Sequence, residues 1–288
     1  MNLNENNENY RIKNVEIFKD TPAWDLALAV EKEDANSIEE ILKTNPELIN
    51  FHDDNYGITP LLWAVGVRKY KSGEALLKCG ADPNIPAKGE LGTPLLVAVM
   101  KPWDDKYVDN TNIIELLLKY KADPNKGYIG EDTLMMESGT SSLHRAVYMG
   151  IEKTKVLVEG GADINIKTKS GRTPAINALI DGSFYKKEAK SAVVAHYLIV
   201  EKKANVSEPY FSRAKNINES ERKENYTIDL LRDWVSDLDS EEYILKMEVV
   251  KEFLRQGVNY WHTEVTDKRL KSIMKLYPND WQEFIKLY

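Results

Sequence analysis

Hydrophobic residues in the middle of this chain recur with the spacing of a helix that buries one face. Leu61, Ala64 and Val65 stand at positions i, i+3 and i+4, and the run 95–99 repeats the arrangement. Residues at this spacing share one side of an α-helix. A second and more apolar run follows, as in residues 113–118. The pattern therefore predicts pairs of helices, and in each pair the second helix is expected to be buried between neighbouring units.

Each first helix is introduced by a turn phrase. A glycine favours a turn position with positive φ, which a residue with a Cβ adopts only at a cost. The threonine that follows can offer its side-chain oxygen to the free amides of the first helical turn, and proline fits next because its missing N–H loses no bond there. The phrase thus predicts a turn directly followed by a helix start. The turn glycines are Gly57, Gly139 and Gly171, and the capping threonines are Thr59, Thr93 and Thr173.

The phrase returns at nearly constant intervals. Its alanine falls at Ala29, Ala64, Ala98, Ala146 and Ala178, so the steps are 35, 34, 48 and 32 residues. The period, the Thr-Pro-Leu-x-x-Ala core and a closing Gly-Ala-Asp-x-Asn phrase resemble the ankyrin repeat, a unit of about 33 residues with a β-turn and two helices. Copies of the closing phrase stand at 80–84, 121–125 and 161–165, with lysine in place of the glycine in the second copy.

The resemblance implies an all-α fold: an ankyrin repeat solenoid of helix-turn-helix units with β-turn fingers. Such units cannot bury both faces alone and must stack on their neighbours. The chain is expected to consist of an N-terminal extension (1–19), a repeat domain (20–263) and C-terminal capping helices (264–288). The repeat domain has five clear repeats, of which the first has lost its turn motif and caps the stack. Residues 228–261 are interpreted as a degenerate sixth repeat.

Composition and charge restrict the class of partner. The chain has 288 residues and a formal net charge of −7. This acidic balance argues against a general nucleic-acid binder, which needs a basic stripe to displace phosphate counterions. Residues 1–9 contain no apolar run, so neither a secretory signal nor a membrane anchor is predicted, and a single cysteine, Cys79, cannot form an internal disulfide. We expect a cytoplasmic monomer with no nucleic-acid or membrane partner.

No pattern of catalytic residues stands out. The chain lacks the nucleophile-elbow, phosphate-loop and dinucleotide-binding glycine motifs. The acidic pairs at 53–54, 104–105 and 131–132 could in principle serve a glycosidase, but adjacent acids in turns normally face water. We therefore predict no enzyme, no cofactor and no metal, with an unrecognised site in the insertions as the alternative. The histidines, His52, His144, His196 and His262, show no metal-binding spacing, and His144 occupies the histidine position of the ankyrin phrase.

The resemblance also implies a protein partner, bound on the concave face through the turn tips and first helices. Carried over position by position, it selects Tyr56, Ile58, Lys88, Glu90, Tyr148, Met149, Lys169 and Arg172. The period breaks at 101–111, 126–138, 181–190 and 207–226, and insertions carry aromatic residues that no repeat core requires. Such residues are favoured interface anchors, although packing onto their own loop explains them equally well. They are Trp103, Tyr107, Tyr128, Phe184 and Tyr185.

The specific role is a hypothesis drawn from similar proteins. The Asn- and Lys-rich sequence resembles small stand-alone ankyrin proteins of bacteria, some of which are immunity proteins that block a cognate toxin. That resemblance implies a toxin partner, and the acidic turn tips favour one with a basic surface. The alternative is an interaction scaffold or a host-directed effector.

Overall fold

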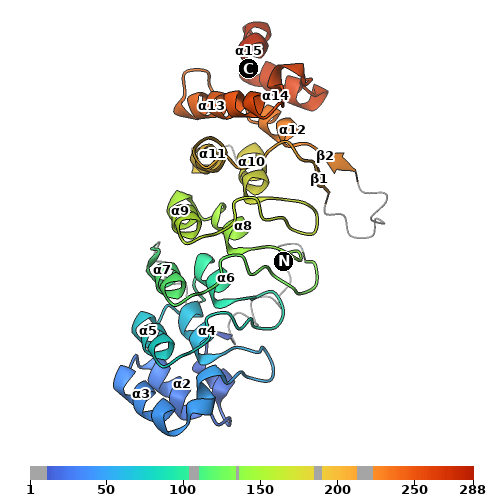
Figure 1. The fold of residues 1–288 in the computed structure, drawn as a ribbon. Helices are drawn as coiled ribbons and strands as arrows, with labels where there is room; N and C mark the ends of the chain where they lie inside the picture. The colour runs from blue at the N-terminus through green and yellow to red at the C-terminus, as the bar shows by residue number, and fades with distance from the viewer. Residues whose placement is uncertain (1–11, 104–109, 134–135, 185–189, 213–222) are drawn as a thin grey trace. The chain divides into compact units, whose positions relative to one another are not determined.

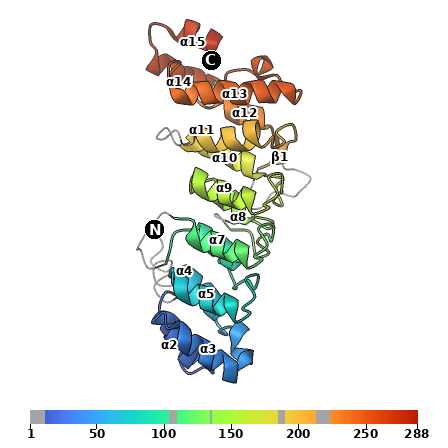
Figure 2. The same cartoon turned by 60° about the vertical axis from the view of Figure 1, so that its left-hand side comes forward.

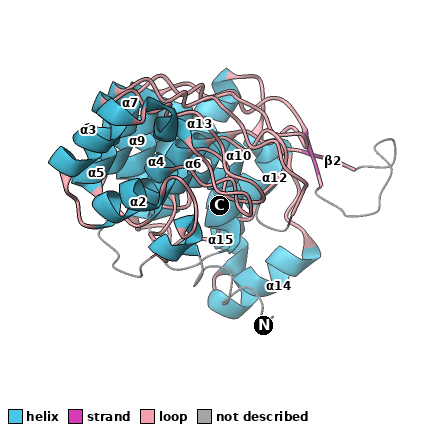
Figure 3. Cartoon of the chain, turned by 90° about the horizontal axis from the view of Figure 1, so that it is seen from below, coloured by secondary structure: helices cyan, strands magenta, loops and turns pink. Residues whose placement is uncertain are grey.

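The chain divides into two compact units, which we call unit 1 (Met1–Asp163) and unit 2 (Ile164–Tyr288). Helices make up most of the regular structure in both (Figure 3). The computed structural model describes residues 12–103, 110–133, 136–184, 190–212 and 223–288.

Helices in the described part of unit 1 form consecutive pairs (Figure 1). The first helices, α2, α4, α6 and α8, contact one another in chain order, and so do the second helices, α3, α5, α7 and α9, as the turned view in Figure 2 also shows. Two helical layers result. The bounds are α2 (Trp24–Glu31), α3 (Ala35–Thr44), α4 (Pro60–Gly66), α5 (Tyr70–Lys78), α6 (Pro94–Val99), α7 (Asn112–Lys119), α8 (Ser142–Ala146) and α9 (Ile151–Glu159), with 3-10 turns at η1 (Val15–Phe18) and η2 (Pro46–Asn50).

The helix starts follow the predicted capping chemistry. The Thr59 hydroxyl accepts the Leu62 amide at 3.1 Å, and the Thr93 hydroxyl accepts the Leu96 amide at 3.2 Å. In both cases proline is the first helical residue. Before α8 the cap is Ser141, which forms a capping box with His144. Threonine and serine caps thus position the first helix of successive repeats in unit 1.

The second helices after α3 end in a left-handed residue, whether or not that residue is glycine. Gly80 and Gly161 have φ values of 96° and 91°, and Lys121 adopts φ 66° at the equivalent position after α7. In unit 2, Lys203 takes φ 63°. The same chain reversal therefore forms at all four positions, with backbone strain at the two lysines.

The closing phrase links each repeat to the next through its asparagine. The side-chain oxygen accepts a main-chain N–H from the following repeat, and the amide group of Asn84 also donates to the Lys121 carbonyl at 3.1 Å. This ladder fixes the stacking of neighbouring repeats in unit 1. Its steps run from Asp82 N to Asn50 at 2.9 Å, from Asp123 N to Asn84 at 2.7 Å and from Asp163 N to Asn125 at 2.7 Å.

Unit 2 begins with a similar helix pair, α10 and α11, and then departs from the regular repeat. Helix α10 contacts α12, and α11 contacts α13, so the segment 228–261 contains a stacked helix pair. The insertion at 207–226 forms two antiparallel strands that the sequence pattern did not predict, with Tyr210 opposite Asn225. The bounds are α10 (Pro174–Phe184), α11 (Lys190–His196), the π-helical turn η3 (Tyr197–Glu201), β1 (Tyr210–Phe211), β2 (Glu224–Asn225), α12 (Thr227–Arg232), α13 (Glu241–Arg255), η5 (Tyr260–His262), α14 (Asp267–Leu276) and α15 (Trp281–Leu287).

Candidate protein-binding surface

After α2, the first helices of unit 1 contribute little exposed surface. Every residue of α4, α6 and α8 is buried. The burial includes large side chains, such as Trp63 at 2% exposed and Arg145 at 8%. The loops that precede these helices, in contrast, expose several side chains. We call these loops finger 2 (52–58), finger 3 (85–92) and finger 4 (126–140).

Asp53 organises finger 2 from inside. Its carboxylate accepts the main-chain amides of Asn55, Tyr56 and Ile58 at 3.0, 2.8 and 2.7 Å, and it is 1% exposed. The expectation that both acids of this pair face water is thus wrong for Asp53, because three amide donors replace its water shell; Asp54 is exposed. Ile58 is 0% exposed and lies in the core, whereas Tyr56 is half-buried.

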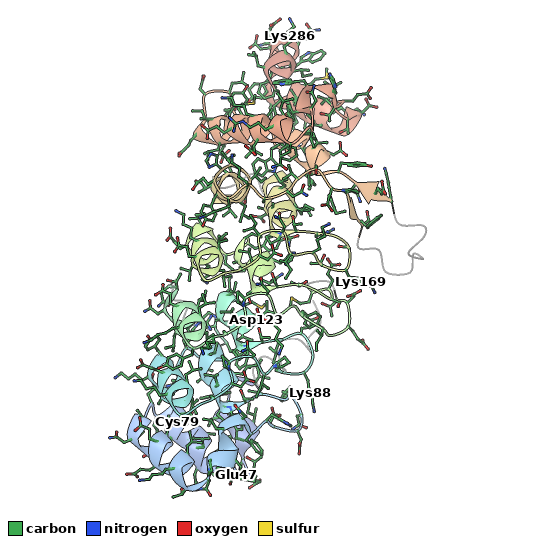
Figure 4. The ribbon with its side chains drawn as sticks, viewed as in Figure 1. Glu47, Cys79, Lys88, Asp123, Lys169 and Lys286 are labelled. Carbon is green, nitrogen blue, oxygen red and sulfur yellow. The ribbon has the colours of Figure 1, made fainter. Side chains whose placement is uncertain are left out.

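Finger 3 is tied to finger 2 through Lys88. The Lys88 amide donates to the Tyr56 carbonyl at 2.7 Å, and its ammonium donates to the Asp54 carbonyl at 2.6 Å. Lys88 is exposed and is labelled in Figure 4. Glu90 is also exposed, and it forms no ion pair with any described residue. The two fingers therefore form one hydrogen-bonded surface with both charges accessible.

Finger 4 has a buried anchor beneath an exposed tip. Tyr128 is 4% exposed, packs with Leu96 and Met136, and donates to the Glu131 carbonyl at 3.0 Å. Burial raises the pKa of Tyr128, and the negative charges of nearby Glu90, Asp132 and Glu131 add to the effect. Tyr128 is thus part of the core. Of the two alternatives for this aromatic residue, its burial fits packing beneath its own loop rather than contact with a partner.

The residue after this anchor is exposed. Ile129 is 80% exposed, and Glu131 and Asp132 beside it are exposed as well. The Asp132 carboxylate accepts the Ser138 amide at 2.9 Å, which holds the tip of the loop. Sequence reasoning missed Ile129, although an isoleucine within a polar insertion was the available signal. Finger 4 therefore presents an apolar side chain among carboxylates.

Trp103 also packs locally. Its amide donates to the Gly66 carbonyl at 2.9 Å, and a Cβ placed on Gly66 would lie 2.4 Å from its ring. The indole therefore lies directly on the end of α4 and is only half-exposed. Tyr107, from the same insertion, lies outside the described residues. Packing onto the repeat accounts for Trp103 without a partner.

The segment after α8 retains some accessible surface. Tyr148 and Met149 are half-buried. The Arg145 guanidinium lies 5.7 Å from the centroid of the Tyr148 ring, which orients the ring by a cation–π contact. Both residues therefore keep part of their surface exposed after α8.

The equivalent loop of unit 2 is basic and aromatic. We call residues 167–172 finger 5; it exposes Lys169, which is labelled in Figure 4, and Lys167, which pairs with Glu208. The Arg172 guanidinium lies 5.6 Å from the Tyr210 ring centroid. Strand β1 is joined to finger 5 by a hydrogen bond at 2.8 Å from the Phe211 amide to Ser170. Tyr185 and the Phe184 side chain lie outside the described residues.

Comparison with known proteins identifies the fold. A family model for the ankyrin repeat matches residues 56–88, which span α4, α5 and parts of fingers 2 and 3. The crystal structure of EF0377, described as an ankyrin repeat protein, matches with a TM-score of 0.50 and 21% sequence identity, covering 80% of this chain and 96% of that one. The chain has the ankyrin repeat fold. The predicted architecture of paired helices with turn fingers is confirmed.

The most buried histidine, His144, has a structural role in capping a helix. His144 is 0% exposed, and its Nδ1 accepts the Ser141 amide at 3.1 Å, so it helps to cap α8. Among the described residues, no three His, Cys, Asp or Glu side chains are grouped as metal ligands would be. No described helix is long and apolar enough to cross a bilayer.

Proposed function

We propose that this chain is a non-enzymatic module that binds a protein partner through its fingers. The observation that carries the proposal is the contrast within unit 1: α4, α6 and α8 are entirely buried, whereas the fingers before them expose charged and apolar side chains. Ankyrin repeats are generally protein-interaction modules. Hydrogen bonds within fingers 2 and 4, and between fingers 2 and 3, hold the main chains of these loops in place, which lowers the entropy lost on binding.

The charge distribution supports a basic partner surface for unit 1. Unit 1 has 18 Lys and Arg against 27 Asp and Glu, a net charge of −9, whereas unit 2 has 21 against 19, a net charge of +2. Exposed acids gather on the fingers of unit 1 at Asp54, Glu90, Glu131 and Asp132. Complementary charge raises the association rate and disfavours wrong partners more than it raises affinity.

As the specific role we propose immunity against a toxin whose basic surface meets unit 1. The support is the resemblance to stand-alone bacterial ankyrin proteins together with the acidic fingers. A scaffold or host-directed effector is the alternative and would use the same surface. A toxin gene directly beside the gene for this chain is expected for immunity, and co-expression should then protect cells from that toxin. If the chain gives no protection against the neighbouring gene product, the immunity role is wrong.

Affinity capture from the native cell tests the binding proposal. We expect the wild-type chain to capture a protein, and a finger variant with Ile129→Ser and Glu131→Gln to capture much less. The matched control carries Tyr70→Ser and Glu39→Gln, which change an exposed apolar residue and an exposed acid on the second helices of unit 1. It should capture as well as the wild type. Equal losses in both variants would contradict binding through the fingers.

A further inference from the structure

Two positively charged side chains are buried in unit 2 without a carboxylate partner. Lys246 of α13 is 0% exposed and Arg232 of α12 is 9% exposed. Within the described residues, neither forms an ion pair with an Asp or Glu side chain. Buried charges are normally paired because the loss of hydration is costly. Some other group must therefore compensate for these two cations.

Tyr288 supplies much of that compensation through its ring. The Lys246 ammonium lies 3.5 Å from the centroid of the Tyr288 ring, and the Arg232 guanidinium carbon lies 5.7 Å from it. The Lys246 ammonium also donates to the Trp234 carbonyl at 2.7 Å. The Phe284 ring stacks with Tyr288 at a centroid distance of 5.1 Å. The electron-rich face of an aromatic ring attracts cations, and more strongly when water is excluded.

Both polar ends of Tyr288 are hydrogen-bonded. Its main-chain oxygen accepts from Arg232 Nη1 and from the Tyr260 hydroxyl, each at 2.7 Å. Its own hydroxyl lies 2.6 Å from the Arg232 carbonyl and 2.5 Å from the Trp234 carbonyl. A phenylalanine at this position would leave these two buried carbonyls without that donor. The contacts thus select tyrosine over other aromatic residues.

We propose that Arg232, Lys246 and Tyr260 form a specific tyrosine-binding pocket, which Tyr288 fills and which thereby latches α15 onto α12 and α13. A purely apolar core at this position would avoid the cost of burying two cations. The pocket instead contacts the ring, the hydroxyl and the main-chain oxygen of one residue. Its ligand is a tyrosine with its own main-chain oxygen, supplied here by the same chain.

Proton binding is coupled to this latch. Burial lowers the pKa of Lys246 well below its ordinary value, Arg232 and Arg269 lower it further, and Asp233 opposes the shift. Tyr260 and Tyr288 also face the ammonium. When the latch opens, Lys246 is hydrated and its pKa rises, so opening takes up a proton. Relative to the open state, the closed latch therefore loses stability as the pH falls from the ordinary pKa of lysine to the lowered pKa of Lys246, and it loses no more below that pKa.

A peptide binding experiment on the full chain tests the pocket. Tyr288→Gly empties the site, and the probe is a labelled synthetic peptide with the sequence of residues 279–288. We expect saturable binding to this variant, and binding to the wild-type chain weaker by about tenfold or more because Tyr288 occupies the pocket. A peptide with phenylalanine in place of its tyrosine should bind about tenfold more weakly, as expected when one buried hydrogen-bond donor is lost.

Two further variants make the test decisive. Tyr277→Gly removes another tyrosine that stacks on Phe284 but leaves the pocket filled, so it should not create a peptide site. If Tyr288→Gly does not fold, Tyr288→Phe in the full chain should speed hydrogen exchange of the α15 amides by about tenfold, with α5 unchanged. Equal binding of the tyrosine and phenylalanine peptides, equal binding to wild type and Tyr288→Gly, or unchanged α15 exchange would overturn the proposal.

Discussion

Units 1 and 2 are stabilised by different kinds of polar contact. In unit 1 an asparagine at the end of each repeat accepts a main-chain amide from the next, and the contact recurs with the period of the sequence. In unit 2 it occurs from Asn205 N to Asn165 at 2.8 Å, and Gln256 then takes over by accepting from Val206 and donating to Ala204, each at 3.1 Å. The pocket around Tyr288 has no counterpart among the contacts of the described residues of unit 1. Unit 1 therefore depends on a repeated contact, and the end of unit 2 on contacts made once.

The largest predicted effect concerns a contact made once. Arg232→Ala should destabilise unit 2 by about 3–5 kcal/mol, because it removes a buried donor to Tyr288 and leaves the pocket incomplete. The matched control is Arg255→Ala, an exposed arginine paired with Glu252 on α13. We expect the control to change stability by less than about 1 kcal/mol. Denaturant unfolding, followed by hydrogen exchange in unit 2, measures the loss of stability in each variant. Similar losses would show that Arg232 in the pocket stabilises unit 2 no more than the exposed Arg255 does.

A tight contact in unit 1 should give the next largest effect. Gly66→Ala places a Cβ 2.4 Å from the Trp103 ring, so the ring must move, at a cost of about 1–3 kcal/mol. Adding Trp103→Ala should remove the clash, so the double variant is more stable than the sum of the single losses predicts. Thermal unfolding of the four proteins in this cycle measures the coupling. Additive losses would mean that Trp103 does not pack on α4 in solution.

The repeated contact can be tested one step at a time. Asn84→Ala removes both the acceptor for the Asp123 amide and the donor to the Lys121 carbonyl, so unit 1 should lose about 1–2 kcal/mol. Asn55→Ala, an exposed substitution in finger 2, should have almost no effect. Equilibrium unfolding in urea compares the two variants. If the Asn84 variant were as stable as the wild type, the ladder would not contribute to stacking.

The smallest effect should be the same in both units. Lys121→Gly and Lys203→Gly should each stabilise the chain by about 0.5–1 kcal/mol, because glycine adopts positive φ without the strain of a Cβ. Gly80→Lys, the reverse change at an equivalent position, should destabilise by a similar amount. Differential scanning calorimetry can resolve these shifts. A destabilising effect of Lys203→Gly alone would indicate that its ion pair with Glu252 outweighs the backbone strain.

The repeated features were predictable because local chemistry determines them. Thr59, Thr93 and Thr173, each followed by proline, cap the helix that follows, and a turn glycine accepts positive φ in any repeat. The period also revealed the recurring asparagine, but not the amide of the next repeat that it binds. The contacts of Trp103 and Tyr128 were ambiguous, since the partner of a loop residue depends on the folded path of the loop. Asp53 was misjudged because its three amide donors are created only by the turn itself.

The pocket in unit 2 could not be predicted. Arg232, Lys246, Tyr260 and Tyr288 stand 14, 14 and 28 residues apart, but they belong to α12, α13, η5 and the end of α15, so the spacing does not place them on one helix face. A buried lysine is indistinguishable in sequence from the exposed lysines around it. Only the packing of α12, α13 and α15 brings these side chains together. Ile129 differs, because an isoleucine in a polar insertion was a usable signal, although only the fold shows that its side chain is exposed.

Hydrogen exchange of the chain in complex with its captured partner tests most directly whether the fingers form the binding surface. Amides in residues 52–58, 85–92 and 126–133 should exchange more slowly in the complex than in the free chain. Amides of α3, α5, α7 and α9 should exchange at the same rate in both. Protection of these second helices, with the finger amides unchanged, would contradict binding through the fingers.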